Sequence, residues 1–80
     1  MGVDTIHHRY HKNLVKLLKR ERLARGLSQS EVASRLQKHH QSWLSGVERG
    51  YRRVDFVEFI LIAEAIGLDP IEVLLEIYGK

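Results

Sequence analysis

The chain contains no cysteine, so neither a disulfide framework nor a thiolate metal site can stabilise it. It has a single proline, and β-branched residues do not alternate with polar ones over the length of a strand. Eighty residues supply one hydrophobic core and no more. We therefore predict one all-α domain over residues 1–80, with an N-terminal tail of about residues 1–5, whose core comes from efficient helix packing.

Long apolar segments are also missing. No stretch approaches the roughly 18 apolar residues of a membrane span, and the first residues, MGVDT, carry no apolar signal-peptide run. We therefore expect a cytoplasmic protein that makes no contact with a membrane.

The charged residues are strongly segregated along the chain, although the net charge is only +3. Residues 1–53 hold 12 Lys and Arg against 4 Asp and Glu, a balance of +8, whereas residues 54–80 hold 1 against 6, a balance of −5. Such a distribution directs a positive field from one end of a small molecule and favours a polyanionic partner. The alternative is a solvated basic face without a partner.

Five helices can be bounded by the residues that start and stop them. Three glycines can take the left-handed conformation that ends a helix: Gly26, Gly50 and Gly67. Three N-cap residues are followed by glutamate three positions later, the spacing of a capping box: Ser28, Asp55 and Asp69. To within a few residues, the predicted helices run from Thr5 or Tyr10 to Arg25, from Ser28 to Leu36, from Gln41 to Arg49, from Phe56 to Ile66 and from Pro70 to Tyr78.

The last two predicted helices carry more apolar residues than one inward face can hold. In the fourth helix, we assign these residues to the core: Phe56, Phe59, Ile60, Ala63 and Ile66. The surplus predicts a homodimer interface made by Val57, Leu61, Val73, Ile77 and Tyr78. The alternative is that the fifth helix is buried in the core of the single chain.

Four segments together resemble the Cro and phage-repressor-like helix-turn-helix family, often called Xre-like. They are LSQSEVA at 27–33, QSWLS at 41–45, VERG at 47–50, and residues 55–70. The resemblance covers roughly residues 6–75 and implies a five-helix, lambda-repressor-like DNA-binding domain whose second and third helices form the helix-turn-helix. It further implies a nucleoid-associated transcriptional regulator, typically a homodimeric repressor that occludes its operator. The resemblance implies no cofactor and no evident small-molecule effector.

The resemblance also implies roles for individual residues. The third helix would place Gln41, Ser42 and Ser45 against base edges, and a glutamine amide can bond adenine bidentately. Phosphate contacts would come from Gln29, Lys38, His40, Trp43, Arg49, Arg52 and Arg53. Gln29 would also brace Gln41, and Trp43 has a second role open to it, packing against the first helix. Arg22 and Glu48 would form a structural ion pair.

The sequence departs from the family pattern at two places. The turn before the third helix is one residue longer than usual, and Gln37 replaces the glycine that opens it. Gly46 stands where many members carry a long polar residue that faces the groove. We expect Gly46 to remove one base contact and to weaken the helix by up to about 1 kcal/mol relative to alanine.

The sequence gives little support for a metal site or for enzyme activity. Five histidines invite a metal site, and His7 with His11 has helical spacing, but zinc needs three or four ligands and no cysteine is present. No nucleophile and base set is apparent, so we expect neither metal binding nor enzyme activity. The alternative function is a protein-interaction or dimerisation module of the same fold with little or no DNA binding.

Overall fold

The computed structural model describes residues 8–36 and 41–79, and this part of the chain forms five helices and no strand. Their bounds are α1 Arg9–Ala24, α2 Gln29–Leu36, α3 Gln41–Glu48, α4 Phe56–Ile66 and α5 Pro70–Tyr78. The predicted all-α, five-helix fold is confirmed. The bounds differ by no more than one residue from the predicted ones when Tyr10 is taken as the start of the first helix, and the alternative start at Thr5 lies outside the described residues.

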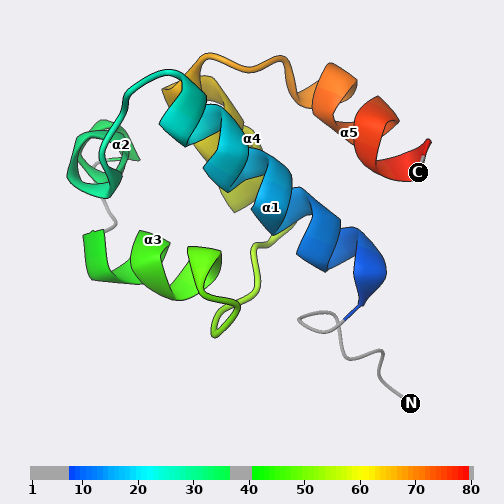
Figure 1. Cartoon of the computed structure of the whole chain (residues 1–80), viewed down its shortest axis with the longest axis horizontal. Helices are drawn as coiled ribbons and strands as arrows, with labels where there is room; N and C mark the ends of the chain where they lie inside the picture. Colours follow the sequence, from blue (N-terminus) through cyan, green and yellow to red (C-terminus); the bar gives the residue numbers. More distant parts are fainter. Residues whose placement is uncertain (1–7, 37–40, 80) are drawn as a thin grey trace.

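The helices α1 and α4 lie at the centre of the molecule, with α2 and α3 on one side of them and α5 on the other (Figure 1). Helix α2 packs against α3 and α4, while α5 packs against α1 and α4. The pair expected to form the helix-turn-helix is thereby separated from the acidic C-terminal helix.

The helix starts follow from local capping chemistry. The hydroxyl of Ser28 accepts from the backbone N–H of Glu31 at 3.0 Å, and the Glu31 carboxylate accepts from the N–H of Ser28 at 2.9 Å. Helix α4 begins with the same reciprocal box, built from Asp55. At the start of α5, the Asp69 carboxylate accepts from the N–H of Ile71 at 2.9 Å, one residue earlier than a capping box would place the bond.

All five helices contribute to one core. Its most deeply buried large side chains are those of Val32, Val47 and Ile62. Phe56 was expected in this core but is 70% exposed, whereas Ile62 is 1% exposed. The inward stripe of α4 is made by Phe59, Ile62, Ala63 and Ile66, positions that recur at helical spacing. Phe56 lies near this stripe by helical spacing, but it is the first residue of the helix and remains exposed at that end.

The structure corrects two members of the predicted dimer interface. Val73 and Ile77 are 4% and 7% exposed and belong to the core of the single chain. They lie four residues apart on the side of α5 that packs against α1 and α4. The exposed apolar residues of α5 are instead Ile71, Leu74, Leu75 and Tyr78, and on α4 the predicted Val57 and Leu61 are exposed.

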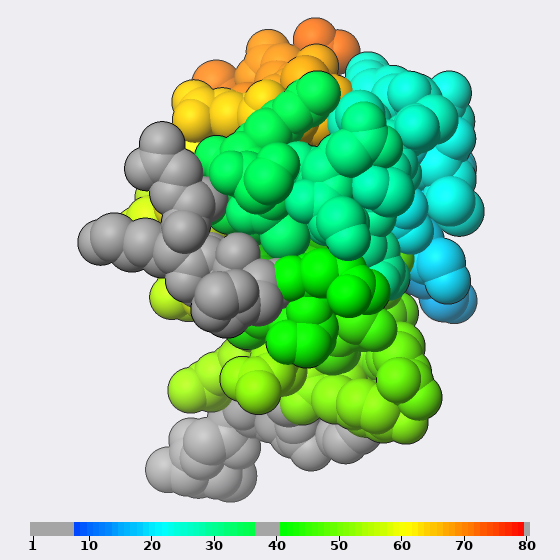
Figure 2. Space-filling view, turned by 90° about the vertical axis from the view of Figure 1, so that its left-hand side faces the viewer, coloured from blue at the N-terminus to red at the C-terminus, as the bar shows by residue number. Residues whose placement is uncertain are grey.

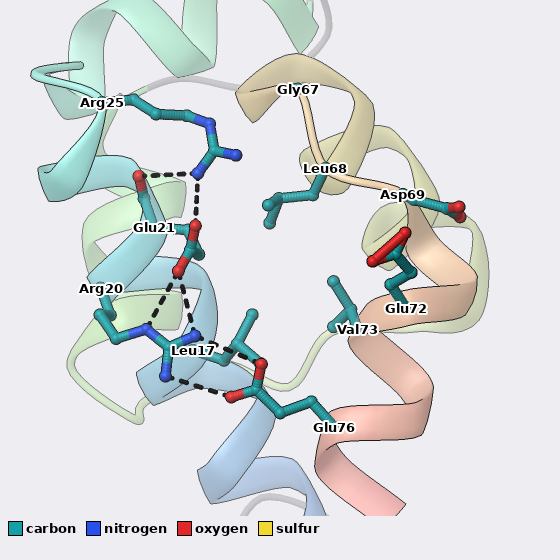
Figure 3. Close-up of a pocket in the computed structure, with 10 residues that line it drawn as sticks. All are labelled: Leu17, Arg20, Glu21, Arg25, Gly67, Leu68, Asp69, Glu72, Val73 and Glu76. Atoms are coloured by element: carbon teal, nitrogen blue, oxygen red, sulfur yellow. Dashed lines mark hydrogen bonds and ion pairs between the residues drawn. The ribbon is translucent and has the colours of Figure 1, made fainter.

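A chain of ion pairs borders the hollow between α1 and α5 (Figure 3). Arg20 of α1 reaches Glu76 of α5 at 3.1 Å and also bonds Glu21, which in turn bonds Arg25. The guanidinium groups of Arg25 and Arg20 hold the pKa of Glu21 below its usual value. Because exposed ion pairs add little stability, α5 is held mainly by the burial of its apolar inner side.

Within residues 8–36 and 41–79, no helix is both long enough and apolar enough to cross a membrane. The same residues contain no group of three histidine or acidic side chains placed to hold a metal ion.

Candidate nucleic-acid interface

Helix α3 presents a polar outer side, while its inner side is buried. Leu44 and Val47 point into the core, whereas Gln41 and Ser42 are exposed and Ser45 is half-buried. Figure 2 shows α2, the start of α3 and the loop after α3 together on one face of the molecule. The turn between the two helices, with Gln37 and the predicted phosphate contacts Lys38 and His40, lies outside the described residues.

A buried ion pair ties the end of α3 to α1. The Arg22 guanidinium donates through Nε to Glu48 Oε2 at 2.7 Å and through Nη2 to Glu48 Oε1 at 2.9 Å. Its Nη1 donates to the carbonyl of Leu27 at 2.7 Å. The two charged side chains are 7% and 4% exposed. A bidentate pair with a third hydrogen bond compensates the burial of both charges and fixes the orientation of α3 relative to α1.

The ion pair continues into two glutamines that lead to the surface. Gln29 Nε2 donates to Glu48 Oε1 at 3.0 Å, and Gln41 Nε2 donates to Gln29 Oε1 at 2.8 Å. A carboxylate only accepts hydrogen bonds, so Gln29 must turn its NH₂ group toward Glu48 and its oxygen toward Gln41. Within the described residues, this leaves one N–H and the side-chain oxygen of Gln41 available to a ligand.

The loop after α3 folds back onto that helix. Gly50 has a φ of +84°, a left-handed conformation that suits glycine. The backbone N–H groups of Tyr51 and Arg52 both donate to the carbonyl of Gly46, at 2.8 and 3.3 Å. This loop and the outer side of α3 together line a shallow hollow made by Gln41, Ser42, Ser45, Gly46, Arg49, Tyr51 and Arg52.

Positive charge borders the hollow. Arg49 and Arg52 line it and are exposed, and the Arg49 guanidinium lies 5.1 Å from the centroid of the Tyr51 ring. Arg53 is exposed in the same loop but lines a separate hollow with residues of α1 and α5. Such a stack holds the cation while leaving its N–H groups at the surface. The arrangement suits a ligand whose polar edges are flanked by anions.

Trp43 is half-buried and packs against the core cluster. Of the two roles that the sequence left open, packing is the one for which the structure gives a contact. The ring therefore helps to seat α3 on the rest of the domain.

A histidine missed by the sequence reasoning anchors the far end of the loop. His11 Nε2 accepts from the backbone N–H of Val54 at 2.9 Å, and burial lowers the pKa of His11. On sequence grounds, this histidine was considered only as a possible metal ligand together with His7. The signal that could have revealed this one is helical spacing, because His11 extends the apolar side of α1 that continues with Leu14 and Leu18.

Comparison with known proteins agrees with this geometry. The sequence matches the model of the family described as "Helix-turn-helix" over residues 18–73. A comparison with curated proteins gave no match.

Among solved structures, an XRE-family like protein from Pseudomonas syringae pv. tomato is similar at 37% identity and a TM-score of 0.85, covering 94% of this chain and 90% of that one. The restriction-modification controller protein C.AhdI from Aeromonas hydrophila is 36% identical, with a TM-score of 0.67, over 82% of this chain and 99% of that one. The controller protein C.Esp1396I, solved as a tetramer with its natural 35 base-pair operator, shares the fold at 18% identity and a TM-score of 0.80, over 91% and 95% of the two chains. The chain therefore belongs to the Xre- and Cro-like helix-turn-helix family of DNA-binding transcription regulators.

Proposed function

We propose that this chain binds duplex DNA sequence-specifically by placing α3 in the major groove. The observation that carries the proposal is the hydrogen-bonded series from the buried Arg22–Glu48 pair through Gln29 to Gln41. It orients Gln41 so that its oxygen can accept from adenine N6 while its remaining N–H donates to N7. A pre-oriented amide loses little conformational freedom on binding, so it favours one base over the others.

The remaining contacts divide between bases and phosphates. The major groove, about 12 Å wide, admits one helix, and the short side chains of Ser42 and Ser45 allow α3 to approach base edges closely. We assign phosphate contacts to Gln29, Lys38, His40, Arg49 and Arg53, whereas Trp43 keeps the packing role. These contacts supply affinity and fix the position of the protein on the duplex, whereas the base contacts supply specificity.

We further propose that the protein acts as a homodimer. The exposed apolar side of α5 (Ile71, Leu74, Leu75 and Tyr78), with Val57 and Leu61 of α4, offers a surface for a second copy. The solved complex of a controller protein of this fold is a tetramer on its operator, which supports self-association on DNA. A dimer would place its two recognition helices about 34 Å apart on one side of the duplex.

Repression by operator occlusion is the mode of regulation that we propose. A dimer spanning two half-sites covers about one turn of the duplex at each half-site and so prevents other proteins from binding there. Transcription from a template carrying the selected operator over its promoter should fall as the protein is added. An increase would instead indicate activation.

Selection of bound fragments from random duplex DNA tests the proposed function. We expect enrichment of a two-fold symmetric site whose half-sites are centred about 10 base pairs apart or a multiple of this spacing. Failure to enrich any sequence would contradict specific DNA binding. Together with self-association of the protein, such a failure would favour an interaction module of the same fold, which the exposed apolar side of α5 also fits.

A further inference from the structure

The side chain of Arg52 fills the space beside Gly46 on the outer side of α3. A Cβ atom added at Gly46 would lie 3.2 Å from Cδ of Arg52 and 3.4 Å from both its Cγ and its Nε. These distances are shorter than ordinary contacts between carbon atoms, so even a methyl group at this position would push the arginine aside by a few tenths of an ångström. Gly46 therefore makes room for a side chain that comes from the loop.

The backbone holds Arg52 in this place. Its N–H donates to the carbonyl of Gly46 at 3.3 Å, beside the 2.8 Å bond from Tyr51, so the start of the side chain lies next to the last turns of α3. The neighbouring Arg49 is directed elsewhere, with its guanidinium over the Tyr51 ring. Arg52 is thus the long cationic side chain that lies across the outer side of α3.

Its neighbours make a base contact more favourable than a phosphate contact. Gly46 lies one helical turn from Ser42 and next to Ser45, on the side of α3 that would face base edges. The two serines are too short to fill a groove of about 12 Å by themselves. A guanidinium can donate two parallel hydrogen bonds, which matches the O6 and N7 acceptors of guanine.

We propose that Arg52 is a specificity-determining residue that contacts guanine in the major groove, in place of the phosphate role that the sequence predicts. The loop thereby supplies the long polar side chain that α3 itself lacks at Gly46. This inference rests on the proposed DNA binding by α3.

Binding of the selected operator by Arg52→Ala tests the inference, with Arg53→Ala as the matched control from the same loop. We expect Arg52→Ala to bind the preferred site about 5- to 140-fold more weakly and to lose preference at one base pair of each half-site. Arg53→Ala should weaken binding to all sequences alike, because it removes a phosphate contact. Arg52→Lys keeps the charge and should keep the salt dependence while losing most of the discrimination.

Gly46→Ala provides a test that leaves Arg52 in the chain. The added methyl group pushes the arginine aside by a few tenths of an ångström and favours the helix, so the variant folds. It should weaken the preference at the same base pair as Arg52→Ala, and adding it to Arg52→Ala should cause little further loss. Replacing the guanine by 7-deazaguanine, which lacks the N7 acceptor, should weaken the wild type but not Arg52→Ala.

The inference is overturned if Arg52→Ala and Arg53→Ala weaken specific and random DNA equally, or if 7-deazaguanine weakens the wild type and Arg52→Ala alike. Its failure is separable from that of the proposed function. A wild type that selects a DNA site without help from Arg52 contradicts only the role of the arginine. A wild type that selects no site contradicts both.

Discussion

At the scale of single residues, Glu48 joins the interior to the proposed DNA surface. One of its oxygens accepts from both Arg22 and Gln29, and the other accepts from Arg22 alone. The carboxylate thus holds the ion pair and also sets the orientation of the glutamine amides. A substitution at Glu48 should therefore affect stability and DNA binding together.

Glu48→Ala should lower the free energy of unfolding by about 3–5 kcal/mol, because it leaves the Arg22 guanidinium buried without its counter-charge. Urea denaturation measures the change. Replacing both partners, Arg22→Met with Glu48→Leu, should recover much of this loss, since no charge is then buried. If Glu48→Ala lowered the free energy of unfolding by no more than the loss of an exposed ion pair does, another group would have to compensate the buried charge of Arg22.

Stability should fall as the pH drops below about 6.5, because of His11. Burial lowers the folded-state pKa of this histidine, so the unfolded chain takes up a proton first and is favoured as the pH falls toward the folded-state pKa. The stability that neutral His11 contributes to the folded state is fully present above the unfolded-state pKa. Thermal unfolding between pH 7.5 and 5.5 measures the effect. The variant His11→Gln should show a shallower dependence, and an unchanged slope would remove His11 from this account.

At the scale of helices, the starts of α2 and α4 were predictable because their signals are local. The capping boxes at Ser28 and Asp55 involve side chains only three residues apart, and both form in the structure. The inward side of α5 was not predictable in this way. That helix carries apolar residues nearly all round, and contact with α1 and α4 decides that Val73 and Ile77 are the buried ones.

Ser28→Ala should destabilise the protein by about 1 kcal/mol, because it removes the hydroxyl that accepts from Glu31 at the start of α2. Ser30→Ala, an exposed change within the first turn of the same helix, is the control and should be nearly neutral. Thermal melts of the two variants give the comparison. Equal effects would mean that the capping box contributes nothing measurable.

The candidate site was predictable in its members and in two of its connections. The family resemblance implied the Arg22–Glu48 pair and the bracing of Gln41 by Gln29, and the structure adds the hydrogen bond from Gln29 to Glu48 that joins the two. The contact of Arg52 with Gly46 could not be inferred from sequence, because it depends on how the loop reverses after Gly50. On sequence grounds, the glycine represented only a lost contact.

At the scale of the whole molecule, the surfaces that we propose for DNA and for a second subunit lie on different sides. The polar side of α3 lies away from α5, which combines acidic residues with an exposed apolar side (Figure 1). An acidic helix is poorly suited to DNA but well placed to meet a second subunit. The charge segregation along the sequence is only partly a division in space, because the basic helix α1 packs against α5 and pairs Arg20 with Glu76.

Leu75→Glu should convert the protein from a dimer to a monomer, because it places a charge in the apolar surface of α5 proposed to pair. Leu75 is 67% exposed, so the variant keeps its core. Leu23→Glu, an exposed change on α1, is the control and should remain dimeric. Analytical ultracentrifugation at micromolar concentrations distinguishes these states. A wild type that stays monomeric, or a dimeric Leu75→Glu, would place the interface elsewhere or exclude it.

The most direct test of specific DNA binding by α3 compares the wild type with Gln41→Ala on the selected operator and on random duplex, from 50 to 200 mM salt. Wild-type affinity should fall by orders of magnitude over about this range, as expected for several phosphate contacts. Gln41→Ala should cost about 1–3 kcal/mol on the operator and little on random DNA. A flat salt dependence, or equal losses on both duplexes, would contradict the account.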